Sequence, residues 1–97
     1  MATCEDYAGT YEVTETNCTT GCTIPSGSTI VVSCSPTTFT LNNQAHSAQI
    51  DANGNLEVPD LGVVAAVTGS DPNRVLFGIV DGDQMTGETE VWGAEQG

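Results

Sequence analysis

Residues 74–92 read RVLFGIVDGDQMTGETEVW, and this stretch decides the fold class of the chain. Apolar and polar side chains alternate on both sides of Asp81-Gly82-Asp83, and alternation with a period of two is typical of a half-buried β-strand. Aspartate and glycine tolerate the backbone conformations of a tight turn, so the two runs are predicted to form a β-hairpin. The stretch therefore indicates an antiparallel β protein.

The register of this hairpin follows from its side chains. A two-residue turn would place polar residues beside Val75, Phe77 and Ile79, whereas a three-residue loop gives them mostly apolar partners. Those partners are Met85, Gly87, Thr89 and Val91. The same register sets Arg74, which is the only lysine or arginine in the chain, opposite Glu90 as a cross-strand ion pair. We therefore expect the three-residue loop, with Phe77 and Ile79 facing the core.

Shorter alternating runs occupy the rest of the chain. They are separated by turn residues such as Pro36, the Asn42-Asn43 pair and the Asn53-Gly54 pair, at intervals of roughly 8–12 residues. The alternating runs cover residues 7–14, 29–34, 37–42, 48–50 and 56–58, and a continuous apolar run covers residues 63–67. We expect one all-β domain over residues 1–97, an antiparallel meander of seven or eight short strands forming a small barrel or a sandwich. Residues 93–97 should be a loose tail.

The four cysteines, Cys4, Cys18, Cys22 and Cys34, all lie in the first third of the chain. An even number in a small β domain favours two disulfides that staple this third, and three connectivities remain open. A zinc site built on Cys18 and Cys22 is a weaker alternative, because the other two cysteines are isolated. Disulfides imply an extracellular, periplasmic or virion location, although no signal peptide is recognisable at the N-terminus.

The charge of the chain is strongly negative and unevenly distributed. Thirteen acidic residues stand against one arginine, a formal net charge of −12. Such a surface repels phosphates, so we expect no nucleic-acid partner, and no run reaches the roughly 20 apolar residues of a membrane span. Residues 16–50 contain no acid at all. This part is either buried against a partner, such as another subunit, or is an ordinary surface rich in threonine and serine.

Groups that could carry catalysis or bind metal are few. Residues 51–55, DANGN, are spaced as a calcium loop begins, but Gly62 stands where the bidentate glutamate belongs, which favours a plain turn. His46 is the only histidine and has no activated nucleophile near it in the sequence. Glu88 and Glu90 share a strand face, which is more typical of a solvated surface than of an acid/base pair. We expect no enzyme activity, metal or cofactor.

An apolar contact surface is predicted on the outward face of the hairpin. In the preferred register Trp92 shares this face with Leu76 and Val80, and exposed aromatic residues beside aliphatic ones often mark contact surfaces. Residues 63–67, VVAAV, form a continuous apolar run, which suits a strand that is buried on both faces or that faces another subunit. Val63 and Val64 therefore complete the candidate surface for a protein partner or for self-association.

Three pieces of sequence carry a family resemblance: AGTYEV at residues 8–13, NGNL at 53–56 and DGDQMTGET at 81–89. Together they resemble small lipocalin-like (calycin) β-barrel domains of extracytoplasmic bacterial proteins, with Tyr11 where the family usually has tryptophan. The resemblance implies an up-and-down barrel with an interior site for a small apolar ligand. Such a cavity would be lined by Tyr11, Phe39, Phe77 and Val91.

These observations favour a non-catalytic structural or protein-interaction module of an extracellular surface or virus particle. The first alternative is a small lipocalin-like carrier of an apolar ligand. The second is an acidic inhibitor that occupies a basic site on another protein.

Overall fold

A computed structural model describes residues 2–17, 23–80 and 91–96 of the chain, and within them the fold is all-β and antiparallel, as predicted. In these residues one turn of α-helix, one 3₁₀ turn and nine strands make up the fold. The elements are α1 (Cys4–Tyr7), β1 (Gly9–Thr16), β2 (Thr29–Ser33), β3 (Thr38–Leu41), β4 (Gln44–Ser47), β5 (Gln49–Ile50), β6 (Leu56–Val58), the 3₁₀ turn η1 (Pro59–Leu61), β7 (Val63–Thr68), β8 (Val75–Val80) and β9 (Val91–Glu95).

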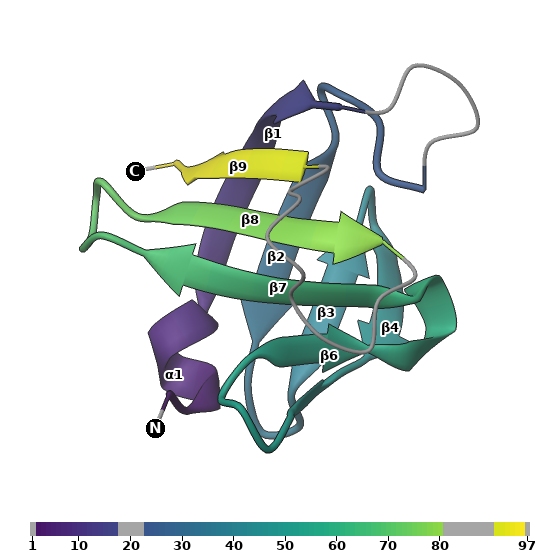
Figure 1. Ribbon diagram of the computed structural model, residues 1–97, viewed down its shortest axis with the longest axis vertical. Coiled ribbons are helices and arrows are strands. Elements are labelled where there is room, and N and C mark those ends of the chain that lie inside the picture. The colour runs from purple at the N-terminus through teal and green to yellow at the C-terminus, as the bar shows by residue number, and fades with distance from the viewer. Residues whose placement is uncertain (1, 18–22, 81–90, 97) are drawn as a thin grey trace.

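The nine strands form one sheet in the order β4-β3-β2-β1-β9-β8-β7-β6-β5. Every neighbour is adjacent in the chain except β1 and β9, which pair with each other and so join the two ends of the meander. The sheet curls so that β7, β8 and β9 lie in front of β1 to β4 (Figure 1). The result is a nearly closed barrel, with its two edges at β4 and β5.

The seam of the barrel is a short bend within one extended segment. Only Ala48 separates β4 from β5, so residues 44–50 pair with β3 over their first part and with β6 over their second. The β5–β6 register continued backwards would set His46 opposite Asp60. Pro59 lacks an N–H for such pairing and begins η1 instead. The side chains of His46 and Asp60 still meet, with Nδ1 and Oδ2 3.7 Å apart.

The core lies inside the barrel and is formed by alternate residues of its strands, as a period of two requires. Its members are Tyr7, Tyr11, Val13, Ile24, Ile30, Val32, Phe39, Leu41, Leu56, Val58, Val63, Ala65 and Leu76. The helix α1 contacts both β2 and β7 and brings Tyr7 into the core at one end of the barrel (Figure 1). The sequence did not predict this helix, although Thr3 and Asp6 form a capping box around it.

The predicted register of the last hairpin is wrong. Phe77 pairs with Trp92 rather than with Gly87, a difference of five residues, and Leu76 pairs with Gly93. Leu76 therefore faces the core, and Phe77 and Ile79 lie on the opposite face of the sheet. The reason is tertiary: β9 must also pair with β1. A Cβ atom at Gly93 would lie 3.4 Å from the carbonyl oxygen of Glu12 and 3.5 Å from Cβ of Tyr11, so the glycine suits close pairing with β1. The predicted loop and the residues up to 90 lie outside the described residues.

The C-terminal prediction was also wrong in part, whereas the turns were predicted well. Gly93 to Glu95, expected in a loose tail, belong to β9. Asn42 and Asn43 both adopt positive φ, of 48° and 71°, as a two-residue hairpin turn requires. Asp51 accepts hydrogen bonds from the backbone of Asn53 and Asn55, at 2.9 Å each, so it serves the predicted turn.

Candidate functional site

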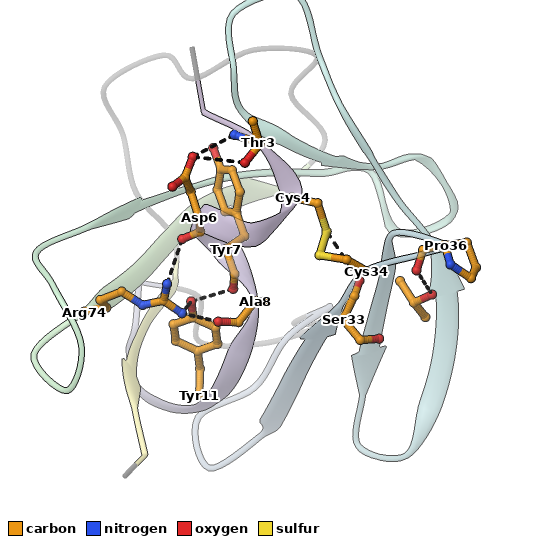
Figure 2. Close-up of a disulfide and its surroundings, with 11 residues drawn as sticks. Thr3, Cys4, Asp6, Tyr7, Ala8, Tyr11, Ser33, Cys34, Pro36 and Arg74 are labelled. Carbon is orange, nitrogen blue, oxygen red and sulfur yellow. Dashed lines mark hydrogen bonds between the residues drawn. A yellow bond between two sulfur atoms is a disulfide. The ribbon is translucent and has the colours of Figure 1, made fainter.

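The most extensive group of buried polar side chains centres on Arg74, the residue before β8. Its Nε and Nη2 atoms donate to the two carboxylate oxygens of Glu95 at 3.0 and 2.8 Å. Nη1 donates to the carbonyl of Asp6 at 2.9 Å, and Nη2 also donates to the carbonyl of Ala8 and the hydroxyl of Tyr11. Figure 2 shows the guanidinium reaching α1 and the start of β1. The Arg74 group thus ties α1, β1, β8 and β9 together.

Two tyrosines extend the Arg74 group into the core. The Tyr11 hydroxyl donates to the carbonyl of Tyr7 at 2.7 Å, and the Tyr7 hydroxyl donates to the carbonyl of Gly54 (Figure 2 shows the first bond). Burial raises the pKa of Tyr11 above its usual value, although the charge of Arg74 opposes this shift. Burial, reinforced by the charge of Asp51, raises the pKa of Tyr7. Both phenols therefore stay neutral hydrogen-bonding groups at physiological pH.

The guanidinium is committed to structure rather than to a ligand. The side chains of Arg74 and Glu95 are only 13% and 9% exposed. Burial disfavours the Arg74 charge, but its hydrogen bond and ion pair with Glu95 raise its pKa overall. The sequence predicted that Arg74 forms an ion pair, but it assigned Glu90 as the partner. Arg74 is the only lysine or arginine beside 13 acids, so an acidic partner was expected. The pairing of Val75 with Ala94 is what places Arg74 beside Glu95.

One disulfide staples the N-terminal third, as predicted. Cys4 of α1 and Cys34, just after β2, are joined with an S–S distance of 2.03 Å and Cα atoms 6.0 Å apart (Figure 2). It holds α1 against the sheet across a sequence separation of 30 residues. Cys18 and Cys22 lie outside the described residues, so the second predicted disulfide remains a prediction.

The predicted apolar contact surface is not where the sequence placed it. Leu76 is 4% exposed and Val63 is equally buried, and both belong to the core. Val64 lies on the opposite face of β7 but is itself only 1% exposed. The side chains of Val80 and Trp92 lie outside the described residues. The prediction for Leu76 failed because it rested on the wrong hairpin register, which exchanged the two faces of β8. Val63 and Val64 are instead buried on both faces of β7, which was the other reading of the apolar run 63–67.

The predicted ligand cavity has little volume. A pocket between the two layers of the barrel has a volume of ≈ 10 Å³, which is about the room that one water molecule needs. Phe39 of the core is among the residues that line it. Phe77 is also among them, but its side chain belongs to the face of β8 opposite to Leu76, contrary to the prediction. Tyr11 instead lies fully buried beside Arg74, and the side chain of Val91 lies outside the described residues.

The acid-free stretch forms a continuous outer face on β2, β3 and β4. The registers place Val31, Thr40 and Ala45 in one row across the three strands, and Ser33, Thr38 and Ser47 in the next. Thr29 extends the face beside β1. All seven side chains are exposed or half-buried, and none can be charged. We call these seven residues the neutral face.

An acidic residue borders the neutral face on its β1 side. Glu12 of β1, which is exposed, pairs with Thr29 there. Asp60 of η1 meets His46 of β4, which points to the other side of that strand from Ala45 and Ser47. The neutral face is therefore an uncharged area with an acid at one side. The sequence predicted an acid-free part, but the pairing of β2, β3 and β4 was needed to show that seven of its residues share one face.

Metal binding and membrane insertion are two further possibilities for the described residues. Within residues 2–17, 23–80 and 91–96, no group of three or more histidine, cysteine or acidic side chains is placed to hold a metal ion. In the same part of the chain, no helix has the length and apolar character needed to cross a membrane. Comparisons with protein-family models, curated proteins and solved structures found no significant match.

Proposed function

We propose that this chain is a non-catalytic structural or protein-interaction module of an extracellular surface or virus particle. The observation that carries the proposal is the neutral face. In a chain of net charge −12, seven side chains on three neighbouring strands form one outward surface without a charge. The interior of protein interfaces is depleted of charged residues relative to the remaining surface, and the neutral face has this character.

The buried polar groups support the same proposal. Arg74 and Glu95 satisfy each other, and the remaining donors of Arg74 go to backbone carbonyls and to Tyr11. Groups held in this way stiffen the barrel and have little capacity left to bind or transform a substrate. The described part of the chain therefore resembles a rigid scaffold that presents a surface.

The two alternatives receive less support. A carrier of an apolar ligand needs a cavity of at least about 300 Å³. The pocket between the two layers of the barrel has a volume of ≈ 10 Å³. An acidic inhibitor would act through exposed acids such as Glu12, Asp60 and Asp71, which belong to different elements of the fold. The neutral face would have no role in such an inhibitor.

The location in the proposal rests on the disulfide. The bond between Cys4 and Cys34 fits an oxidising environment, because cytosolic thiols are normally kept reduced. Small domains exposed on surfaces and particles often use such bonds to supplement a limited core.

Native mass spectrometry of the protein isolated from its natural source, without reductant, tests the proposal. The expected result is an assembly with another protein chain or with further copies, which persists at raised ionic strength. A monomer that retains a small apolar ligand would support the carrier and overturn the proposal. A complex that dissociates as salt is added would instead support the acidic inhibitor.

A further inference from the structure

We propose that the partner of the neutral face is a second copy of this chain, docked through its own neutral face. This inference rests on the proposed function and names the partner. The two copies would be related by a twofold axis, so that the same patch contributes from each side. The contact would then be built from Thr29, Val31, Ser33, Thr38, Thr40, Ala45 and Ser47 of both copies.

The distribution of charge selects this mode of association. All nine described acids lie off the neutral face, on α1, β1, β6, β9, η1 and the turns. A pairing through α1, β1, β6, β9 or η1 would bring acids of one copy against acids of the other, and like charges at a contact oppose association. Docking of neutral face on neutral face keeps the nine described acids out of the contact. A strongly basic partner, by contrast, finds no counter-charge on this face.

The side chains of the neutral face suit a contact. Threonine and valine are β-branched and lose little rotamer freedom when they are buried. Hydroxyl groups can both donate and accept hydrogen bonds, so a patch of threonine and serine can pair with its own copy. At the β4 side of the neutral face no further strand follows in the sheet order.

The size of the neutral face sets the expected strength. Three neighbouring strands span about 10 Å between the outer two, and a strand of five residues is about 17 Å long. The area of the neutral face is therefore well below the roughly 800 Å² that each partner contributes to a standard interface. We therefore expect a weak dimer that forms in the micromolar to millimolar range. Such contacts become effective when many copies are held close together, as on a surface or particle.

The apolar side of β7 and β8 that faces away from the core is a less suitable surface. Val64 and Ile79 are cross-strand partners there and are already buried in the single chain, while Ala66 and Phe77, the next pair on this face, are half-buried. A side chain that is buried before docking contributes little new apolar area. The neutral face, in contrast, has exposed or half-buried side chains throughout.

Sedimentation equilibrium of the isolated chain tests the inference. The probe is Thr40→Glu, which sets two like charges near the centre of the contact, and its matched control is Thr68→Glu, at an exposed position of β7. We expect the wild type and Thr68→Glu to dimerise alike, and Thr40→Glu to dimerise at least about 100-fold more weakly. Because salt screens the repulsion between two acidic chains, dimerisation should strengthen from about 0.05 M to about 1 M salt.

Circular dichroism and thermal melting establish that each variant is folded, and Ala45→Glu in the same row replaces the probe if Thr40→Glu is not. A wild type that remains monomeric at millimolar concentration in both salts overturns the inference. Equal weakening by Thr40→Glu and Thr68→Glu also overturns it, because net charge alone would then be responsible. If the natural assembly contains a different protein while the isolated chain is monomeric, the inference fails and the proposed function stands.

Discussion

Removing the charge of Glu95 should destabilise the whole barrel, because this residue neutralises the one buried cation. In Glu95→Gln the shape of the side chain is kept, and Arg74 can still donate one hydrogen bond to the amide oxygen. The guanidinium, 13% exposed, then lies without a counter-ion between α1, β1 and β9. The loss is not local, because the same group holds the carbonyl groups of Asp6 and Ala8.

The expected cost is about 3 kcal/mol, the lower end of the range for leaving one member of a buried ion pair without its partner. A domain of this size is stable by about 5–15 kcal/mol, so the variant should still fold. For a chain of this length, such a loss lowers the melting temperature by roughly 12–24 °C. Arg74→Met should cost at least as much, because it also leaves the carbonyl groups of Asp6 and Ala8 without their donor.

The assay is a double-mutant cycle measured by urea denaturation at neutral pH, with Arg74→Met, Glu95→Gln and the double variant. We expect the double variant to be more stable than the sum of the single losses predicts, by about 1–3 kcal/mol, because no charge is then stranded. The matched control is Asp60→Asn, which disrupts an exposed contact with His46 and should cost less than about 1 kcal/mol. Additive losses within about 0.5 kcal/mol, or a cost for Asp60→Asn equal to that for Glu95→Gln, would refute the reasoning.

Three further predictions concern the same end of the barrel. Gly9→Ala would place a methyl group against the ion pair, 2.8 Å from Nη2 of Arg74. It should lower the melting temperature more than the control Gly27→Ala, because φ at Gly27 is also positive but no atom lies within 4 Å. Similar decreases in melting temperature for both variants would count against the clash. Replacing Cys4 and Cys34 together by serine should cost about 3–4 kcal/mol in chemical denaturation, since the disulfide closes a long loop, and an unchanged unfolding midpoint would contradict a stabilising staple. Because burial raises the pKa of Tyr11 above 10.0, the folded chain retains a proton that the unfolded chain releases, so stability is complete below this pH and is lost as pH rises through the raised pKa. Melting temperatures across this range should fall less steeply for Tyr11→Phe, and parallel curves would refute the assignment.

The sequence was a good guide to local structure. Alternation of apolar residues placed β2, β3, β6 and most of β1, because a strand with one buried face has a period of two whatever its neighbours are. The continuous apolar run placed β7, whereas Tyr7, expected in the first strand, belongs to α1. Turn residues such as Asn42, Asn43 and Gly54 also identified their hairpins, because the positive φ of these turns is a property of the residues themselves.

Long-range pairing was the part that local pattern could not supply. The predicted register of β8 and β9 made the best apolar match within the hairpin alone. In the protein β9 has β1 as a second neighbour, and Gly78 and Gly93 lie with Leu76 on the inner face. The candidate surface at Leu76 failed for the same reason. Knowledge that the first and last strands pair would have corrected both predictions.

The neutral face could be predicted from the sequence only in part. The absence of acids from residues 16–50 is visible in the sequence, and an interpretation as a buried contact was among the expectations. The alternation in β2 and β3 also indicates which residues point outward. The register of the hairpins was needed to bring Val31, Thr40 and Ala45 into one row.

The central proposal is that the uncharged outer side of β2, β3 and β4 is the surface through which two copies of the chain make contact. A nuclear magnetic resonance dilution series, recorded from millimolar to micromolar concentration, tests it residue by residue. We predict that amide signals of Thr29–Ser33, Thr38–Leu41 and Gln44–Ser47 shift with concentration while those of Val63–Thr68 do not. Shifts centred on the acidic elements instead, or no shifts anywhere in the series, would contradict it.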